Sequence, residues 1–458
     1  MDGMDSMKSW LGTKALYRET LRLGLPIALQ TLIAVGMNMI DTVMLGRMGD
    51  ACVSAASFAG QYVTMGLICA MAVGMGAGVL ATRFYGMGDR DSLKQTITIM
   101  LRCELLVAVA FTIAAGVLPH GVIGLFTEDA AVIGHGATYL RMLLPAYCAM
   151  CFSQGCTIVL RSAGVLWMPM LASALGLGVN ALCNWVLIYG KLGVTPMGVL
   201  GAALATTIAW LAQMLVVCGY FFFAERDIAY RLRDLRTSCK ALVKPYLQIS
   251  LPLLVGDTLF GLGNSAISVI MGRMGVTYGA ANSVTVVVQQ FSTVLQHGAA
   301  GASGIITGYT LGRGEQETAQ RQGYAFVTMG VGLGLLAAVG ILLLRGPLLS
   351  YYQVSAEAKA VAWQLINGML VTVVLQSVNG ILTKGVLRAG GDTKFLMVGD
   401  VLFLWVISVP LGALAGLVWR LPPFWVYVSL KADQMVKCVW CVARLYSGKW
   451  VRQIGGSS

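Results

Sequence analysis

PIALQTLIAVGMNMIDTVMLGRMG at residues 26–49 has a counterpart in PLLVGDTLFGLGNSAISVIMGRMG at residues 252–275. Both stretches open on a proline, continue as an apolar run and close on Gly-Arg-Met-Gly, and residue 252 lies 226 positions after residue 26. Further along, LRSAG at 160–164 is matched by LRAGG at 387–391, at an offset of 227. The chain is therefore expected to consist of two similar halves.

The composition predicts a polytopic membrane protein. Hydrophobic residues make up 57% of the chain and charged residues 11%, against about 25% charged residues in soluble domains. The mean hydropathy is +0.76. Apolar runs of roughly 20 residues recur along the chain, and each can cross a hydrocarbon core of about 30 Å as a helix. A membrane chain with two similar halves is typical of transporters that bind near the repeat interface.

Twelve spans follow from these apolar runs, in an all-α fold. We expect them at about 25–45, 54–80, 95–117, 137–158, 168–189, 199–223, 247–271, 280–306, 323–344, 359–386, 395–417 and 423–445. The polar stretch between the two sets of six predicts this division: an N-terminal segment 1–22, an N-lobe 23–223, a linker 224–245, a C-lobe 246–446 and a tail 447–458. Six helices per lobe is an even number, so the repeats are expected to be parallel.

Basic residues set the expected orientation. They concentrate in the segments that share a side with both termini, so both termini are predicted to be cytoplasmic, in the cytoplasmic membrane. This placement accounts for the net charge of +12 through anionic lipids of the inner leaflet rather than nucleic acid. Residues 1–22 do not have the pattern of a cleaved signal peptide. The glycine-rich run 74–78 is interpreted as close helix packing, with helix bending during transport as the alternative.

The sequence offers little for an enzyme. Three histidines are scattered, the cysteines lie mostly in apolar runs, and the single CxxC at 438–441 has no second pair. We therefore expect no catalytic residues, no bound metal and no cofactor beyond a coupling ion. A membrane enzyme, a receptor and a passive channel are the rival classes.

Asp41 is the first candidate functional residue. An ionised carboxylate at mid-membrane costs roughly 2.5–3.5 kcal/mol on insertion scales, and helical spacing puts Gln30, Asn38 and Asp41 on one face. The alternative is a carboxylate solvated at the outer end of its helix. Expected partners in the fifth and sixth spans are Asn180, Asn184, Thr206 and Thr207. Together these oxygens suit a hard cation, while a desolvated Asp41 suits a proton, and the asparagines alternatively serve as interhelical hydrogen bonds.

Several intramembrane residues, most of them polar, are predicted to line a substrate cavity. They are Gln30, Met37, Asp257, Asn264, Gln376, Asn379, Asp400 and Lys431. Asp433 and Lys437 are four residues apart and can neutralise each other, which leaves Asp257 or Asp400 as the expected partner of Lys431. A structural ion-pair network is the alternative to a substrate site here.

These motifs resemble the multidrug and toxic compound extrusion (MATE) transporters of the wider flippase superfamily. The resemblance covers roughly residues 20–450 and rests on Pro26 with MIDTVMLG at 39–46, on LRSAG at 160–164, on Asn180 with Asn184, and on LRAGGDTK at 387–394. It implies two six-helix lobes around a central V-shaped cavity. It also implies a monomer that exports cationic, amphipathic drugs in exchange for sodium or protons.

The same resemblance assigns Asp41 to cation coupling and Asn180 to the cation site of the N-lobe. The sequence departs from family branches at two places: Asn184 replaces an acid in the fifth helix, and Phe260 replaces a glutamate in the seventh. Ser377 also lies near an aspartate position of the tenth helix. The departure at Asn184 lowers the negative charge of the N-lobe site, whereas those at Phe260 and Ser377 argue against a C-lobe cation site. A flippase for lipids or lipid-linked oligosaccharides is the alternative function.

Overall fold

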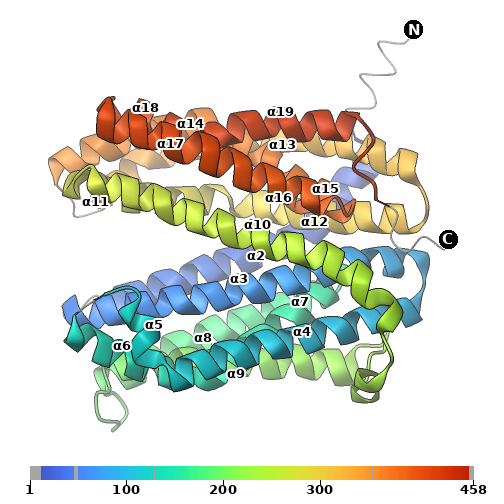
Figure 1. Ribbon diagram of the computed structural model, residues 1–458, viewed down its shortest axis with the longest axis horizontal. Coiled ribbons are helices and arrows are strands. Elements are labelled where there is room, and N and C mark those ends of the chain that lie inside the picture. Colours follow the sequence, from blue (N-terminus) through green and yellow to red (C-terminus); the bar gives the residue numbers. More distant parts are fainter. Residues whose placement is uncertain (1–11, 46–49, 128, 352–354, 453–458) are drawn as a thin grey trace. The chain divides into compact units, whose positions relative to one another are not determined.

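The structure is a computed structural model, and it describes residues 12–45, 50–127, 129–351 and 355–452. Within these ranges every regular element is a helix (Figure 1). Nine helices of the described chain are long and apolar enough to cross a membrane, and the pair α6 (Ala130–Met142) and α7 (Leu144–Ser162), bent by 54°, adds a tenth span. The predicted all-α polytopic fold is confirmed.

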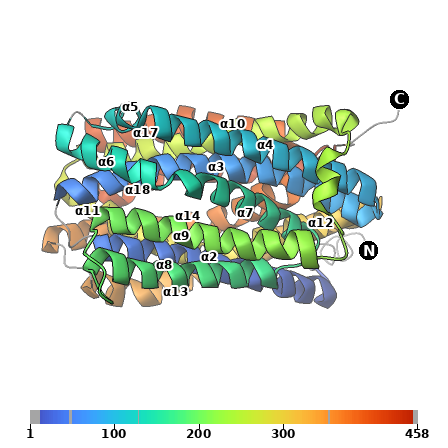
Figure 2. The same ribbon diagram turned by 90° about the horizontal axis from the view of Figure 1, so that it is seen from below.

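The helices belong to two compact units. The N-terminal unit is Gln30–Leu254, and the C-terminal unit combines the chain up to Leu29 with the chain from Val255 onward. Elements of the N-terminal unit are α3 (Asp50–Met87), α4 (Arg90–Val117), α5 (Pro119–Gly124), α6, α7, α8 (Trp167–Tyr189), α9 (Val199–Gly219), η1 (Tyr220–Ala224) and η2 (Leu232–Arg236). Helices α8 and α9 run side by side (Figure 2).

The C-terminal unit is built around α14, which packs against α13, α11 and α18. Its elements are α11 (Val276–Ser292), α12 (Val294–Gly312), α13 (Gln316–Tyr351), α14 (Ala356–Ile381), η3 (Leu382–Val386), α15 (Leu387–Ala389), α16 (Thr393–Leu402), η4 (Phe403–Ser408), α17 (Val409–Ala413), η5 (Leu414–Val418), α18 (Pro423–Leu430) and α19 (Ala432–Tyr446). The expected spans 280–306 and 423–445 each correspond to two shorter helices. If each of these pairs counts as one span, as α6 with α7 does, the order of helices along the chain agrees with twelve spans.

Two long helices, α2 (Lys14–Leu45) and α10 (Lys240–Arg273), are divided between the units. The division falls after Leu29 and after Leu254, within three residues of the repeated prolines Pro26 and Pro252. A proline inside a helix removes a backbone hydrogen bond and favours a bend. The compact units therefore divide the chain at other positions than the lobes expected at 23–223 and 246–446.

Specific contacts hold the first part of each long helix in its unit. A Cβ on Gly24 of α2 would lie 3.1 Å from the Gly298 carbonyl oxygen of α12, so these two backbones approach closely. In α10, the Tyr246 hydroxyl donates a hydrogen bond of 2.8 Å to the Val73 carbonyl of α3. A larger residue at position 24 would not allow the close approach of α2 to α12. An apolar residue at position 246 would not make the hydrogen bond that holds α10 to α3.

The glycine run of α3 serves close packing, as predicted. A Cβ on Gly78 would lie 2.9 Å from Ile158 of α7, and Gly74 faces the same isoleucine. Gly76 faces Ser250 of α10, where a Cβ would again overlap. Small residues let membrane helices approach through their backbones, which increases van der Waals contact.

The segment between η1 and α10 packs on α4 rather than extending away from it. The Tyr230 hydroxyl is 2.9 Å from that of Thr98, and Arg102 donates to the Leu235 carbonyl at 2.7 Å. Asp234 pairs with Lys94 at 3.2 Å. Burial would raise the pKa of Asp234, but the Arg231 backbone N–H and the Lys94 ammonium hold it below its ordinary value.

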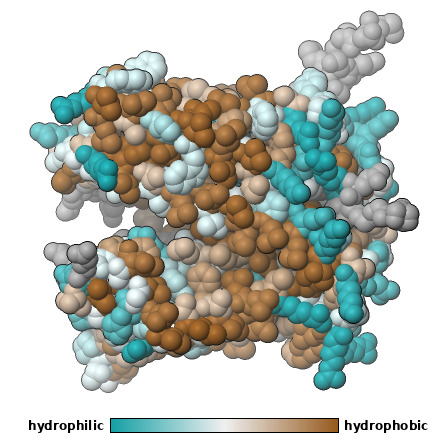
Figure 3. Space-filling view, in the orientation of Figure 1, coloured by the Kyte–Doolittle hydropathy of each residue, from teal (hydrophilic) through white to brown (hydrophobic). Residues whose placement is uncertain are grey.

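The outer surfaces suit a lipid environment. Hydrophobic residues cover much of the visible face of each unit along the helices, and hydrophilic residues gather towards helix ends (Figure 3). Leu343 of α13 is 72% exposed and Leu106 of α4 is 70% exposed. Such exposure of large apolar side chains is costly in water but not in lipid.

Helix α13 allows a test of backbone packing. A Cβ on Gly334 would lie 2.6 Å from the Val374 Cα of α14, whereas a Cβ on Gly332 meets nothing within 4 Å. We expect Gly334→Ala to destabilise the protein by about 1–3 kcal/mol through overpacking. Thermal unfolding in detergent measures this, with Gly332→Ala as the matched control. Equal unfolding temperatures for the two variants would contradict the close approach.

Candidate functional site

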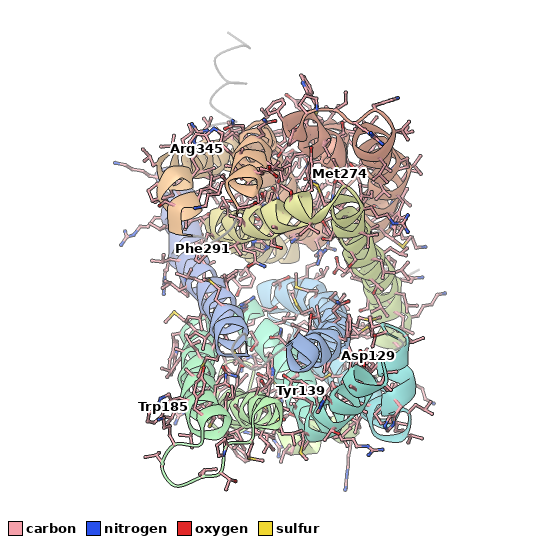
Figure 4. The ribbon with its side chains drawn as sticks, turned by 90° about the vertical axis from the view of Figure 1, so that its left-hand side faces the viewer. Asp129, Tyr139, Trp185, Met274, Phe291 and Arg345 are labelled. Carbon is pink, nitrogen blue, oxygen red and sulfur yellow. The ribbon has the colours of Figure 1, made fainter. Side chains whose placement is uncertain are left out.

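The C-terminal unit contains a partly open cavity of about 450 Å³. Side chains from α10, α11, α12, α14, η3, α18 and α19 line it. Met274, just after α10, and Phe291 of α11 are labelled in Figure 4 and mark two of the segments that form it. The polar part of the lining includes Asn264, Gln289, Gln296, Gln376 and Gln434. Cavities of this size suit drug-sized ligands.

The charged groups of this lining are basic. Lys384 and Lys431 line the cavity, together with His297, and the described lining contains no aspartate or glutamate. His297 Nδ1 lies 2.8 Å from the Thr293 carbonyl oxygen, which can only accept, so Nδ1 carries a proton. Its Nε2 then accepts in the neutral ring and faces Lys384 Nζ at 3.5 Å. The cavity therefore presents positive charge and amide groups.

The acids of this unit lie outside the lining, although Asp257 interacts electrostatically with Lys384, and Asp433 with Lys431. Asp257 pairs with Arg388 at 3.3 Å, and Asp400 pairs with Lys437. Asp433 accepts a 2.9 Å hydrogen bond from Ser408 and another from Gln434. The expected Asp433–Lys437 pair is wrong, because Lys437 reaches across to α16 instead. The expected pairing of Lys431 with Asp257 or Asp400 is also wrong, because other cations occupy both carboxylates.

Lys384 enters the cavity from a π-helical turn, η3. The turn packs on α12, since a Cβ on its Gly385 would overlap Ser303 and the Ala300 carbonyl. Single π-turns within α-helices occur often at functional sites because they redirect side chains. Here the turn interrupts the path from α14 to α15 beside the cavity.

The predicted cavity residues separate into three groups. Asn264, Gln376 and Lys431 line the cavity. Asn379 stands behind it, where its Nδ2 donates to the backbone carbonyl of Gln434 at 2.7 Å. Outside this lining are Asp257 and Asp400, held in their ion pairs, and Gln30 and Met37, which belong to the N-terminal unit.

In the N-terminal unit, two predicted cation-site residues come together. Asn184 Nδ2 donates to Asn180 Oδ1 at 3.0 Å, and both side chains are fully buried. The Asn180 amide nitrogen, Nδ2, has no hydrogen-bond acceptor among the described residues. Thr207 donates to the Met142 carbonyl at the bend between α6 and α7.

The structure describes the remaining residues of this predicted site less completely. Thr206 is partly exposed in α9. Asp41 and Asn38 are in α2, but their side chains lie outside the described part of the structure. Their contact with Asn180 stays a prediction.

The repeated LRxxG motifs make equivalent contacts in the two units. Arg161 donates to the Gln30 side-chain oxygen, four residues after Pro26. Arg388 binds Asp257, five residues after Pro252. Gln30 is further held by Ser173 at 2.9 Å. In both halves, an arginine near the end of a helix thus secures the stretch that follows the repeated proline.

Sequence reasoning missed part of the cavity and one buried acid. The residues Asn282, Thr285, Gln289, Thr293 and Gln296 recur at helical spacing and form a polar stripe that periodicity could have revealed. Glu104 lies within the expected span 95–117 and is fully buried; the rule that singled out Asp41 applies to it equally.

A repeat-based membrane bundle with an internal polar cavity defines a class of secondary transporter. Comparison with known families is consistent with this class: a profile of the MatE family matches residues 26–186 and 252–414, more than half of the chain. The chain therefore belongs to the MatE family. The two matched ranges begin at the repeated prolines, which confirms the internal duplication.

The similarity to relatives extends along most of the chain. The chain is 25% identical over 406 residues to a probable multidrug resistance protein NorM of Bradyrhizobium diazoefficiens, covering 86% of this chain and 85% of that protein. A NorM of Mesorhizobium japonicum is also 25% identical, over 95% of this chain and 94% of its own length. A crystal structure of MATE in complex with MaL6 shares the fold, with a TM-score of 0.85 at 20% identity, covering 96% and 98% of the two chains.

The Asp257–Arg388 pair allows a test of charge compensation in the C-terminal unit. The Arg388 side chain is 8% exposed and that of Asp257 31%. Removing the acid strands a buried cation, so Asp257→Asn should cost stability near the lower end of about 3–5 kcal/mol. Arg388→Met should cost less, because water can solvate the remaining Asp257. Thermal unfolding of both variants and of the double variant measures the coupling; additive losses would show that the pair does not interact.

Proposed function

We propose that this chain is a secondary active multidrug antiporter of the cytoplasmic membrane, with both termini in the cytoplasm. The polar cavity inside a duplicated membrane bundle is the observation that supports it most strongly. The multidrug-resistance names of the relatives favour drug export over the flippase alternative. Export against a gradient then requires an exchanged cation, sodium or proton.

Coupling is assigned to Asp41 with Asn180 and Asn184. The buried asparagine pair of α8 supplies amide oxygens in the unit that also contains the second part of α2. In the proposed cycle, cation binding at Asp41 favours the state that releases the drug, and cation loss restores drug affinity. Coupling follows because drug and cation favour different states.

Asp41→Asn tests this coupling. Ethidium efflux from proteoliposomes should proceed under one imposed gradient, sodium or proton, and fall at least about tenfold in the variant, since the amide cannot bind either ion as a carboxylate does. Asp91→Asn, at an exposed acid in the first turn of α4, is the control and should transport normally. Full activity of Asp41→Asn would refute the assigned site.

The charge of the cavity favours a substrate class beyond the cationic drugs that the resemblance implies. Lys384 and Lys431 with surrounding amides suit ligands that bring a carboxylate, carbonyl or phosphate oxygen to the cavity. A purely cationic ligand would meet like charge there. We therefore infer that zwitterionic or anionic amphipathic compounds bind in the C-terminal unit.

Lys431→Met should separate these substrate classes. Losing the ammonium should raise the KM for the fluorescent zwitterion ciprofloxacin by about tenfold, the loss of one charge-assisted hydrogen bond. The KM for ethidium should stay equal or fall. Lys449→Met, at an exposed lysine after α19, serves as control. Equal effects of Lys431→Met on both compounds would refute a charge-selective cavity.

A further inference from the structure

Glu104 is a carboxylic acid in the middle of a membrane helix. It lies 14 residues after Arg90, the first residue of α4, and therefore roughly 21 Å along that helix. Its side chain is 0% exposed. Neither the predicted coupling site nor the cavity of the C-terminal unit includes this residue. A buried intramembrane acid is a functional candidate unless a partner neutralises it.

No described cation neutralises Glu104. The basic residues of α4 nearest to it bind elsewhere: Arg102 donates to the Leu235 carbonyl at 2.7 Å, and Lys94 pairs with Asp234. Both Glu104 oxygens lack a hydrogen bond of normal geometry among the described residues. The Cys151 thiol of α7, a weak donor, is the side chain that approaches the carboxyl group.

The titratable groups around Glu104 are all of kinds that are neutral at ordinary pH. They are Cys69 of α3, Cys103 of α4 itself, Cys151 and Cys156 of α7, and Tyr246 of α10. Thiols are weak donors, and the Tyr246 hydroxyl already donates to the Val73 carbonyl. Among the described groups, this shell therefore offers Glu104 no positive charge and no strong donor.

The helices nevertheless leave room for the carboxyl group. A Cβ on Gly155 of α7 would lie 3.2 Å from Glu104 Oε1 and 3.3 Å from its Cγ. A Cβ on Gly74 of α3 would lie 3.6 Å from the same oxygen. Gly155 thus presents bare backbone to the acid and leaves it room, whereas a Cβ on Gly74 would make only an ordinary contact with the carboxyl group.

An ionised carboxylate in such a site costs far more than the neutral acid, because neither water nor a counter-charge stabilises it. We propose that Glu104 is a proton-binding site of the N-terminal unit, protonated while α3, α4 and α7 pack as they do here. Its proton passes to water only when this packing opens. Protons then favour the packed arrangement of the N-terminal unit. The consequence for transport rests on the proposed antiport, but proton binding itself does not.

Infrared spectroscopy tests the proton directly. At neutral pH, reconstituted wild-type protein should show the C=O stretch of a protonated carboxylic acid, and E104Q should lose it. Glu225→Gln is the matched control: Glu225 is 2% exposed but accepts three backbone N–H bonds, from Asp227, Ile228 and Ala229, as an ionised carboxylate requires. The band should survive in that variant. An unchanged band in E104Q would overturn the proposal.

Thermal unfolding gives a second readout that does not need activity. The amide side chain introduced by E104Q imitates the neutral acid, so that variant should fold. As the pH rises from about 5 to about 8, above the ordinary range of glutamate, the unfolded wild type ionises while the folded protein holds the proton. The wild-type Tm should therefore fall relative to that of E104Q. A constant difference across this range would show that Glu104 binds no proton on folding.

Transport then separates this proposal from the proposed function. Under a proton gradient, E104Q should lose most uphill efflux but keep drug binding. If wild-type protein transports nothing under either gradient while the infrared band behaves as expected, the antiport proposal fails and the proton site stands. If E104Q transports like wild type with an unchanged pH profile, Glu104 does not take part in coupling.

Discussion

The cost of an uncompensated charge between membrane helices is the constraint on which this structure depends. In the C-terminal unit it is met by ion pairs between distant helices, such as Asp257 with Arg388 and Asp400 with Lys437. Outside the spans, Asp392 is 1% exposed and binds both Arg444 and Arg452. These pairs join segments that are far apart in the sequence, so they fix helix register as well as charge.

The placement of acids within the C-terminal unit also determines the charge of the groups that line its cavity. Because other cations occupy Asp257 and Asp400, and Ser408 and Gln434 bind Asp433, the described lining retains only basic charge. The basic lining thus reflects the placement of these acids outside it.

Local patterns in the sequence predicted much of the fold. Hydropathy located the spans, and the repeated prolines and Gly-Arg-Met-Gly stretches showed the duplication. The spacing of Asn180 and Asn184 indicated their shared face, which their hydrogen bond confirms. The ion pairs were not predictable in this way. Lys437 has Asp433 four residues away, yet it pairs with Asp400 of another helix, because tertiary packing decides which acid is near. For Glu104, the sequence shows that the residue lies within a membrane span. It does not show that the described residues offer this acid no partner.

The two units differ in how their buried charges are neutralised. Both keep an arginine of the repeated motif against the stretch that follows a proline, so their common origin is still visible in Arg161 and Arg388. The partner is the neutral Gln30 in one unit and the acidic Asp257 in the other. In the N-terminal unit, by contrast, the buried acid Glu104 has no counter-charge among the described residues. A group that stays neutral by binding a proton responds to protons, whereas one neutralised by arginine does not. Duplication followed by this divergence leaves a buried acid without a described counter-charge in one half and a cavity lined by basic groups in the other.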